Sequence, residues 1–253
     1  EDLFRNKQFP SAFECKVCHP VQFRQWSVSH HAYGNLSPFF TSVENAILSK
    51  TNGTSADTCS RCHAPLSAVL KTMQISNVKR QQFAQAGEDF LGPVVEGITC
   101  VVCHRFDKRY GKRSARSLIT QGDIFAPIFG PTNNDIQAET EKDSRLNLVT
   151  ERGKKGRAIH KVVEPYPFLR ASRFCGNCHS SRLPTGVHNE ETFDEYRTSQ
   201  SAKDGVTCQD CHMGKVPGEN KGFDFAPAAV IGKTETKPRR LSNHYFAGPD
   251  FSV

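Results

Sequence analysis

The segment Cys15-Lys-Val-Cys18-His19 holds two cysteines that are separated by two residues and followed at once by a histidine. The same C-x-x-C-H pattern occurs four more times, at Cys59-Ser-Arg-Cys62-His63, Cys100-Val-Val-Cys103-His104, Cys175-Gly-Asn-Cys178-His179 and Cys208-Gln-Asp-Cys211-His212. We number these motifs 1 to 5 in chain order. Together they use all ten cysteines of the 253-residue chain, so no cysteine is left for another role.

The spacing predicts covalent haem at every motif. C-x-x-C-H is typical of c-type haem attachment, because two thiols add to the two vinyl groups of one porphyrin while the adjacent imidazole binds the iron. Disulfides and zinc-ribbon ligation are the alternatives, but neither accounts for a histidine after every cysteine pair. We therefore expect five haem c cofactors, attached through the ten cysteines. The expected proximal iron ligands are His19, His63, His104, His179 and His212.

Five further histidines match the number of second axial positions. They are His30, His31, His160, His188 and His244. His30 and His31 are adjacent, so on a helix they point about 100° apart and serve different irons, with His31 the stronger candidate. Met73 fits better as core filling, and Met213 follows a proximal histidine too closely to reach the same iron. We expect mostly bis-histidine haems of low potential, with one five-coordinate haem as the alternative.

The composition predicts a chain that wraps its cofactors. Hydrophobic residues make up 37% of the sequence and the mean hydropathy is −0.53, which is little apolar material for a core of this size. We expect a mainly α, loop-rich fold with little β structure and a core formed by the five haems. Helices are predicted at 20–33, 38–50, 65–86 and 190–202, with Ser37 and Asn189 as caps. No run of about 18 apolar residues exists, so no transmembrane segment is expected.

The gaps between motifs leave no room for a haem-free domain, so we expect a single pentahaem domain over 1–253. Within it we expect two-haem sub-modules at 11–70 and 170–215 and a basic loop region at 105–165. A short internal repeat supports the sub-modules. Gly97-Ile-Thr-Cys matches Gly205-Val-Thr-Cys, and Phe23-Arg-Gln-Trp-Ser-Val-Ser resembles Phe193-Asp-Glu-Tyr-Arg-Thr-Ser. The repeat predicts that the haems of motifs 1 and 2 resemble those of motifs 4 and 5.

The formal charge of +7 would ordinarily indicate an anionic partner. Propionates and ferric irons bring the holoprotein to about +2 when oxidised and about −3 when reduced. No nucleic-acid motif is present, and no nucleic-acid partner is expected. One basic cluster is predicted to be a docking face for an acidic redox partner. It consists of Arg105, Lys108, Arg109, Lys112, Arg113 and Arg116.

Several longer stretches resemble the multihaem c-type cytochromes grouped around hydroxylamine oxidoreductase and the tetrahaem cytochrome of ammonia oxidisers. These stretches are Cys15–His31, Cys59–Pro65, Phe174–His179, Glu191–Tyr196, Gly205–Met213 and the late His244-Tyr-Phe-Ala-Gly, which looks like the element that supplies a distal ligand. The resemblance implies closely spaced haems, in parallel and near-perpendicular pairs, that act as an electron wire. The C-x-x-C-Lys site of pentahaem nitrite reductases is absent, and hydroxylamine oxidoreductase has eight motifs, so both departures count against an enzyme.

The sequence therefore predicts a multihaem cytochrome that passes electrons along five closely spaced haems. Its expected partners are redox proteins or an extracellular electron acceptor, and a homo-oligomer or filament would form if a distal histidine bound a haem of the next subunit. The alternative is a reductase or oxidase of small nitrogen or sulfur oxyanions at one five-coordinate haem. Covalent haem attachment occurs outside the cytoplasm, so we expect a periplasmic or extracellular protein whose signal peptide has been removed.

Overall fold

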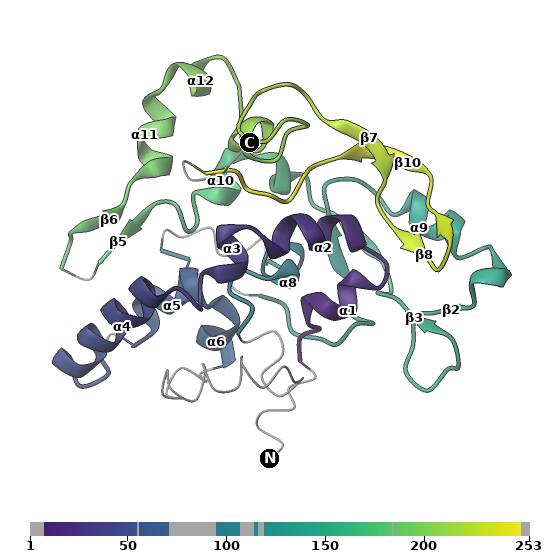
Figure 1. The fold of residues 1–253 in the computed structure, drawn as a ribbon, viewed down its shortest axis with the longest axis horizontal. Helices are drawn as coiled ribbons and strands as arrows, with labels where there is room; N and C mark the ends of the chain where they lie inside the picture. Colours follow the sequence, from purple (N-terminus) through teal and green to yellow (C-terminus); the bar gives the residue numbers. More distant parts are fainter. Residues whose placement is uncertain are drawn as a thin grey trace.

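The computed structural model of the chain describes residues 8–54, 56–70, 95–106, 114–115, 119–183 and 185–248. Short helices dominate these segments and are joined by turns and irregular chain (Figure 1). The α-helices are α1 (Ala12–Lys16), α2 (Pro20–Ser27), α3 (His30–Tyr33), α4 (Pro38–Lys50), α5 (Ala56–His63), α6 (Pro65–Leu70), α8 (Cys100–His104), α9 (Asp135–Thr140), α10 (Ser172–Cys175), α11 (Thr192–Thr198), α12 (Gln200–Lys203) and α13 (Cys208–His212). The 3₁₀ helices are η2 (Ser144–Leu146) and η3 (Pro167–Arg170). The predicted loop-rich, mainly helical character is confirmed in the described segments.

In the described part of the chain, the β-strands pair two by two and form no larger sheet. The strands are β1 (Ile128–Gly130), β2 (Leu148–Val149), β3 (Arg157–Ala158), β4 (Val163–Pro165), β5 (Ser181–Arg182), β6 (His188–Glu190), β7 (Asp224–Pro227), β8 (Val230–Ile231), β9 (Thr234–Glu235) and β10 (Pro238–Leu241). The ribbons β1–β4 and β2–β3 are parallel, whereas β5–β6, β7–β10 and β8–β9 are antiparallel. Ribbons this short bury little surface, so their role is to link neighbouring loops by hydrogen bonds.

The predicted helix at 38–50 is confirmed as α4. Its N-cap is Ser37, whose Oγ accepts the backbone N–H of Phe40 at 3.3 Å, and a proline occupies the first helical position. The helix predicted at 65–86 begins as α6 at the expected residue. Its continuation over 71–86, which includes Met73, lies outside the described residues.

Two other predicted helices are each divided by a serine. The helix at 20–33 breaks at Ser29 into α2 and α3, and the helix at 190–202 breaks at Ser199 into α11 and α12. Both serines have an extended backbone, with ψ angles of 155° and 165°. Each serine side chain also bonds a nearby backbone group, which competes with the helical hydrogen-bond ladder. Asn189, the predicted cap, lies in β6 instead.

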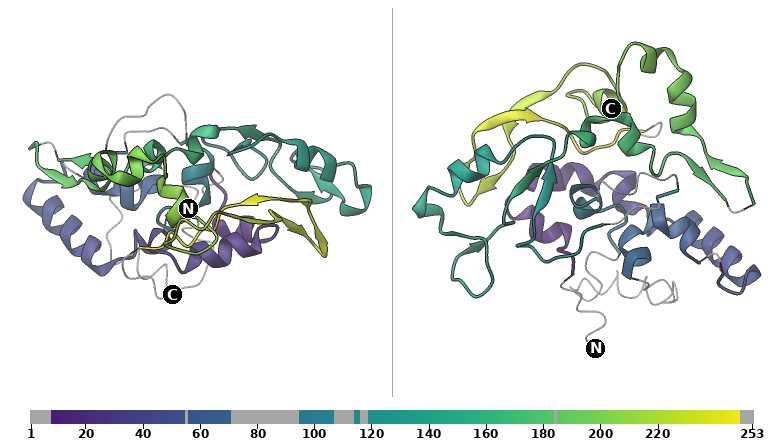
Figure 2. Two further views of the ribbon diagram at one scale, coloured as in Figure 1. Left: turned by 90° about the horizontal axis from the view of Figure 1, so that it is seen from above. Right: turned by 180° about the vertical axis from the view of Figure 1, so that it is seen from behind.

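The described segments are spread along one long direction, and motifs 1 and 3 lie near its middle. Figure 1 and the reverse view in Figure 2 place α4 at one end and α9 with the β2–β3 ribbon at the other. The last segments return to the first ones. The backbone N–H of Val230 in β8 donates to the carbonyl of Cys18 at 2.8 Å, and the N–H of His244 donates to Gln25 Oε1 at 3.0 Å. The late part of the chain therefore packs against motif 1.

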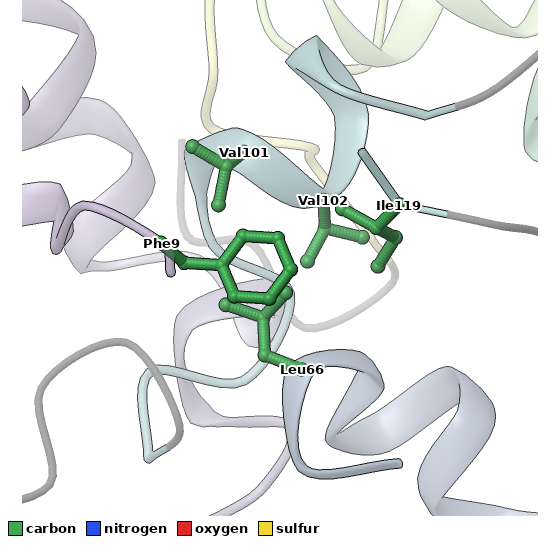
Figure 3. Packing of buried hydrophobic residues seen from close by; sticks show 5 residues of the cluster. All are labelled: Phe9, Leu66, Val101, Val102 and Ile119. Carbon is green, nitrogen blue, oxygen red and sulfur yellow. The ribbon is translucent and has the colours of Figure 1, made fainter. Parts of the chain in front are cut away.

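Buried hydrophobic side chains form small clusters among the described residues. One cluster joins the segment before α1 to α6 and α8 (Figure 3), and it consists of Phe9, Leu66, Val101, Val102 and Ile119. Another consists of Ala12, Trp26 and Ala32. Large apolar side chains elsewhere stay exposed, among them Phe13, Phe39 and Phe225, at 62%, 79% and 74%. Protein side chains alone therefore supply little core for the described chain. No helix in these segments is long and apolar enough to cross a lipid bilayer.

Candidate haem-binding site

Each C-x-x-C-H motif starts in a short helix. Motifs 1 to 5 lie at α1, α5, α8, α10 and α13, in that order. Helical spacing places the first cysteine, the second cysteine and the histidine on one side, because residues three and four apart are neighbours on a helix. In motif 1 the N–H of His19 donates to Cys15 O at 2.8 Å, and in motif 4 the N–H of His179 donates to Cys175 O at 3.0 Å. The helical turn thus reaches the histidine, and each motif offers two thiols and one imidazole together.

Backbone carbonyls from distant segments hold several of the proximal imidazole rings. The bonded pairs are His19 Nδ1 with Ala228 O at 2.7 Å, His104 Nδ1 with Phe129 O at 2.7 Å, and His212 Nδ1 with Ala247 O at 2.5 Å. A carbonyl only accepts, so Nδ1 carries the proton and Nε2 keeps its lone pair free for a metal. Histidine ligands of metals commonly have such a second contact, which fixes the ring orientation. These residues therefore fit a group whose iron binds Nε2.

Two of the remaining histidines face a proximal histidine at a distance that suits a shared metal ion. The ring centroids of His31 and His179 lie 6.3 Å apart, and those of His104 and His244 lie 6.4 Å apart. Two imidazole nitrogens, each about 2 Å from one metal and about 1 Å in front of its ring centroid, require centroids about 6 Å apart. The ring of His31 is closer to that of Phe246, at a centroid separation of 4.4 Å.

Burial keeps three of the candidate distal histidines uncharged. It is the largest cause that lowers the pKa of His31 and His160 to about 4 and the pKa of His244 to about 3. In each case the next cause is the charge of one proximal histidine. These neighbours are His179 for His31, His19 for His160 and His104 for His244. Neutral imidazole is the form that binds a metal, so all three side chains are ready to bind at physiological pH.

His30 and His188 have different surroundings. The side chain of His30 is exposed, although it follows a buried serine and precedes His31. His188 lies in β6 and not at the start of a helix, and its Nδ1 is 2.5 Å from Glu191 Oε1. The ring of the proximal His63 stacks on Phe40, with centroids 4.5 Å apart. The two ring pairs involve motifs 3 and 4, and neither His30 nor His188 belongs to them.

Cysteines of different motifs are neighbours, because they act on one another's pKa. Cys100 raises the pKa of Cys15, Cys62 raises that of Cys178, and Cys208 raises that of Cys175. These pairs join motif 1 to motif 3, motif 2 to motif 4, and motif 4 to motif 5. No two of the ten cysteines form a disulfide. In the described segments no three histidine, cysteine or carboxylate side chains are grouped to hold a single metal ion.

The internal repeat of the sequence has a counterpart in space. The indole N–H of Trp26 donates to Ile98 O at 2.9 Å, and the hydroxyl of Tyr196 donates to Val206 O at 2.9 Å. In each copy, an aromatic side chain that follows one motif thus donates to a backbone carbonyl. That carbonyl belongs to the residue two positions before the cysteine of a Gly-x-Thr-Cys sequence. The repeat therefore joins motif 1 to motif 3 and motif 4 to motif 5, where the sequence suggested a relation between motifs 1 and 2.

Gly97 fixes the backbone of a candidate ligand. Its φ of +64° lies in the left-handed region, and a Cβ at this position would be 2.4 Å from the carbonyl oxygen of His31. The next residue, Ile98, donates its N–H to the same oxygen at 2.9 Å. Only glycine allows this approach without a shift of the backbone. The matching glycine of the repeat, Gly205, also has a positive φ of +74° but no atom within 4 Å of its Cβ position.

Glu96 joins motif 1 to motif 3. Its carboxylate accepts the N–H of Ala12 at 2.9 Å and the hydroxyl of Thr99 at 2.6 Å, and it also accepts the hydroxyl of Ser11. Burial nevertheless raises the pKa of Glu96 above its ordinary value. Sequence reasoning missed Glu96, Gly97 and the carbonyls that hold the proximal rings. The repeated Gly-x-Thr-Cys was the one signal that pointed near them.

The predicted basic docking face is wrong for Arg105. This side chain is 1% exposed and its guanidinium bonds backbone carbonyls, so it belongs to the interior. Its position directly after motif 3 explains the burial, because the end of α8 packs into the small core. The other members, at 108, 109, 112, 113 and 116, lie outside the described residues.

Comparisons with known proteins agree with this geometry. Residues 14–105, which contain motifs 1 to 3, match a family model described as cytochrome c554 and c-prime. No curated protein matches the chain. The fold is similar to that of a penta-heme cytochrome c552 from Thermochromatium tepidum, with 22% sequence identity and a TM-score of 0.53. The match covers 97% of this chain and 58% of that one. The chain is therefore similar to c-type cytochromes over residues 14–105, and its fold is similar to that of a penta-heme cytochrome.

Proposed function

We propose that this chain is a pentahaem electron-transfer cytochrome in which every C-x-x-C-H motif carries one covalent haem c. The observation that carries the proposal is the pair of imidazole–imidazole separations of 6.3 and 6.4 Å between residues far apart in sequence. Bound haem would supply a one-electron carrier at each motif. Kinship with the wider hydroxylamine oxidoreductase group, suggested by the sequence stretches, is part of the proposal.

Two of the proposed second axial ligands follow from the ring separations, and the third, His160, follows from the effect of the His19 charge on its pKa. His31 would complete the site of motif 4, His244 that of motif 3 and His160 that of motif 1. His30 and His188 would serve motifs 2 and 5. Two imidazoles that are fixed by packing keep substrates away from the iron and move little when an electron arrives. Such sites suit electron transfer better than chemistry on a bound substrate.

The neighbouring cysteines support a branched electron route. Because each cysteine would bear one edge of a porphyrin, neighbouring cysteines of two motifs imply closely spaced haems. These pairs join motif 1 to 3, motif 2 to 4 and motif 4 to 5. Cys103 also raises the pKa of both cysteines of motif 4, which brings motif 3 near motif 4. Motif 4 would therefore be the branching point of a route that starts at motif 1.

The partners and the location of this route are proposals of the same kind. Electrons would pass to or from redox proteins or an extracellular acceptor, with the chain placed in the periplasm or outside the cell. A filament requires a distal histidine to bind a haem of the next subunit. The exposed His30 is the candidate distal histidine with the freest access to such a neighbour.

The test is optical and EPR spectroscopy of the oxidised holoprotein and of His31→Ala and His244→Ala. We expect low-spin haems in the parent protein, and one haem converted to high spin in each variant. Added imidazole should restore the low-spin state, which separates loss of a ligand from misfolding. A variant that keeps all haems low-spin contradicts the ligand assignment. A high-spin band in the parent protein that shifts with nitrite, hydroxylamine or sulfite supports the oxyanion enzyme instead.

A further inference from the structure

The outer side of a C-x-x-C-H helix carries the two residues between its cysteines. On a helix these residues lie about 100° and 200° from the first cysteine, whereas the second cysteine and the histidine return to its side. Both are exposed in motif 1, where they are Lys16 and Val17. In each of the other motifs the first of the two is buried, namely Ser60, Val101, Gly176 and Gln209. Among the described residues, protein therefore leaves the outer side of the motif helix open at motif 1.

This open side of α1 is apolar over two turns. Phe13 and Val17 are four residues apart, so they are neighbours on the helix, and they are 62% and 72% exposed. Ala12, three residues before Cys15 and thus on the cysteine side, has no exposed surface. A haem bound to the thiols and the imidazole would lie on that buried side and leave Phe13 and Val17 in water. Single apolar side chains scattered on a surface are ordinary, whereas adjacent ones indicate an interaction site.

Lys16 adds a positive charge to the same side of the helix. Its ammonium lies 4.9 Å from the ring centroid of Phe23 in α2 and 6.0 Å from that of Phe13. In the described part of the chain Lys16 forms no ion pair, and the carboxylate of Glu14 on the same helix accepts the backbone N–H of Ser11 at 3.0 Å instead. A cation that rests on aromatic rings and is not neutralised attracts a carboxylate from another molecule.

We propose that the α1 face, which consists of Phe13, Lys16 and Val17, is the docking surface for an acidic electron-transfer protein that exchanges electrons with the haem of motif 1. The inference rests on the proposed function and names the point where electrons enter its route. Apolar contact would hold the partner, and Lys16 would orient it and speed its approach. One electron passes from the reduced partner to ferric haem across one helix, about 10–12 Å thick with its side chains, and no bond forms or breaks.

The size of the α1 face favours a transient partner. A stable interface occupies about 20–30 residues a side, whereas weak electron-transfer encounters are smaller. Three side chains on a five-residue helix fit the second class. The unpaired charge of Lys16 selects a partner whose own docking face carries carboxylates, because opposite charges steer encounter and like charges oppose it.

The test measures electron transfer by stopped-flow absorbance from a reduced plant-type [2Fe–2S] ferredoxin, an acidic donor of about −400 mV, to the oxidised five-haem protein. Lys16→Glu reverses the charge. Val17→Asp removes the apolar contact, and motif 5 carries Asp210 at the corresponding position, so haem attachment should be retained. We expect each change to lower the second-order rate constant about tenfold at low ionic strength. The effect of Lys16→Glu should shrink in high salt, because exposed charges are screened.

Two matched controls lie in α4, away from α1 in both Figure 1 and Figure 2. Lys50→Glu changes the net charge by the same amount as Lys16→Glu. Phe39→Ser removes a phenylalanine that is 79% exposed and is the counterpart of Phe13→Ser. Both controls should keep the parental rate constant, whereas Phe13→Ser should lower it.

The outcomes distinguish the docking inference from the proposed function. Parental rate constants in Lys16→Glu and Val17→Asp, or equal losses in the controls, would refute the inference. A parent dimer that Val17→Asp dissociates in sedimentation would assign the α1 face to a second copy. Binding to phosphatidylserine–phosphatidylcholine vesicles that Val17→Asp abolishes would assign it to lipid, and either result overturns the protein partner. A five-haem protein that dithionite reduces but ferredoxin does not refutes docking alone, whereas a chain without haem refutes the proposed function.

Discussion

Replacing Gly97 by alanine tests how the backbone positions a proposed iron ligand. A residue with a Cβ in the left-handed region costs about 1–2 kcal/mol. At φ +64° the new Cβ would in addition lie 2.4 Å from His31 O and 3.0 Å from Ala32 O, which are backbone atoms that yield only if the chain shifts. Overpacking of this kind costs about 1–3 kcal/mol. Loss of the hydrogen bond from Ile98 to His31 would add about 1 kcal/mol.

Gly205→Ala is the matched control for this change. Its φ of +74° imposes the same conformational cost, but no atom lies within 4 Å of the new Cβ. The gain from restricting the unfolded chain is common to both variants and cancels in the comparison. We therefore expect Gly97→Ala to lower the free energy of unfolding by about 2–4 kcal/mol more than Gly205→Ala.

Denaturant unfolding of the holoproteins, followed by circular dichroism, measures this difference. The oxidised absorption spectrum reports the ligand at the same time. Gly97→Ala should show a high-spin fraction, because a shift of the His31 carbonyl moves the whole residue, whereas Gly205→Ala should stay low-spin. Equal stability losses in the two variants, or an unchanged spectrum in a destabilised Gly97→Ala protein, would refute the reasoning.

Three further predictions follow from the same contacts. Trp26→Phe, which removes a buried donor from a carbonyl, should cost about 1–3 kcal/mol of unfolding free energy, and Tyr196→Phe, at a half-buried site, about 0.5–1.5 kcal/mol. Parent-like stability of either variant in denaturant unfolding would count against the repeat as a structural unit. Burial raises the pKa of Glu96 above 4.5, so the folded protein favours the protonated form. The stability of the parent protein relative to Glu96→Gln should therefore be greatest below 4.5 and fall as the pH rises through the raised pKa, and a pH-independent difference in unfolding would contradict this. The ring planes are 61° apart in the His31 pair and 22° apart in the His244 pair, which predicts two distinct low-spin EPR signals. The more anisotropic signal should vanish in His31→Ala, and the more rhombic signal should vanish in His244→Ala. Loss of the same signal in both variants would be incompatible with the pairing.

The local chemistry of the motifs could be predicted well from the sequence. The C-x-x-C-H spacing is complete within five residues, so cofactor type, attachment and proximal ligands can be predicted without knowledge of the fold. The α4 helix was predictable for the same reason, since Ser37 caps it from the adjacent position. The identity of the candidate distal histidines came from counting and not from geometry. Which of them faces which motif depends on contacts across more than 100 residues, such as that of His31 with His179.

The structural features that could not be predicted from the sequence depend on contacts between distant segments. Nothing in the sequence around Ala228 or Phe129 marks them as acceptors for proximal imidazoles, because any residue has a backbone carbonyl. Arg105 looked like part of an exposed basic run, yet carbonyls 17 to 21 positions away in sequence bury it. Serines within a helical pattern gave no clear boundary, whereas the structure breaks helices at both Ser29 and Ser199.

Intact mass spectrometry of the denatured holoprotein tests the central claim most directly. Thioether bonds survive denaturation, so the account predicts the 28.2 kDa polypeptide with the added mass of five haems and no free thiol. A chain at its bare polypeptide mass, with ten titratable cysteines or five disulfides, would contradict it.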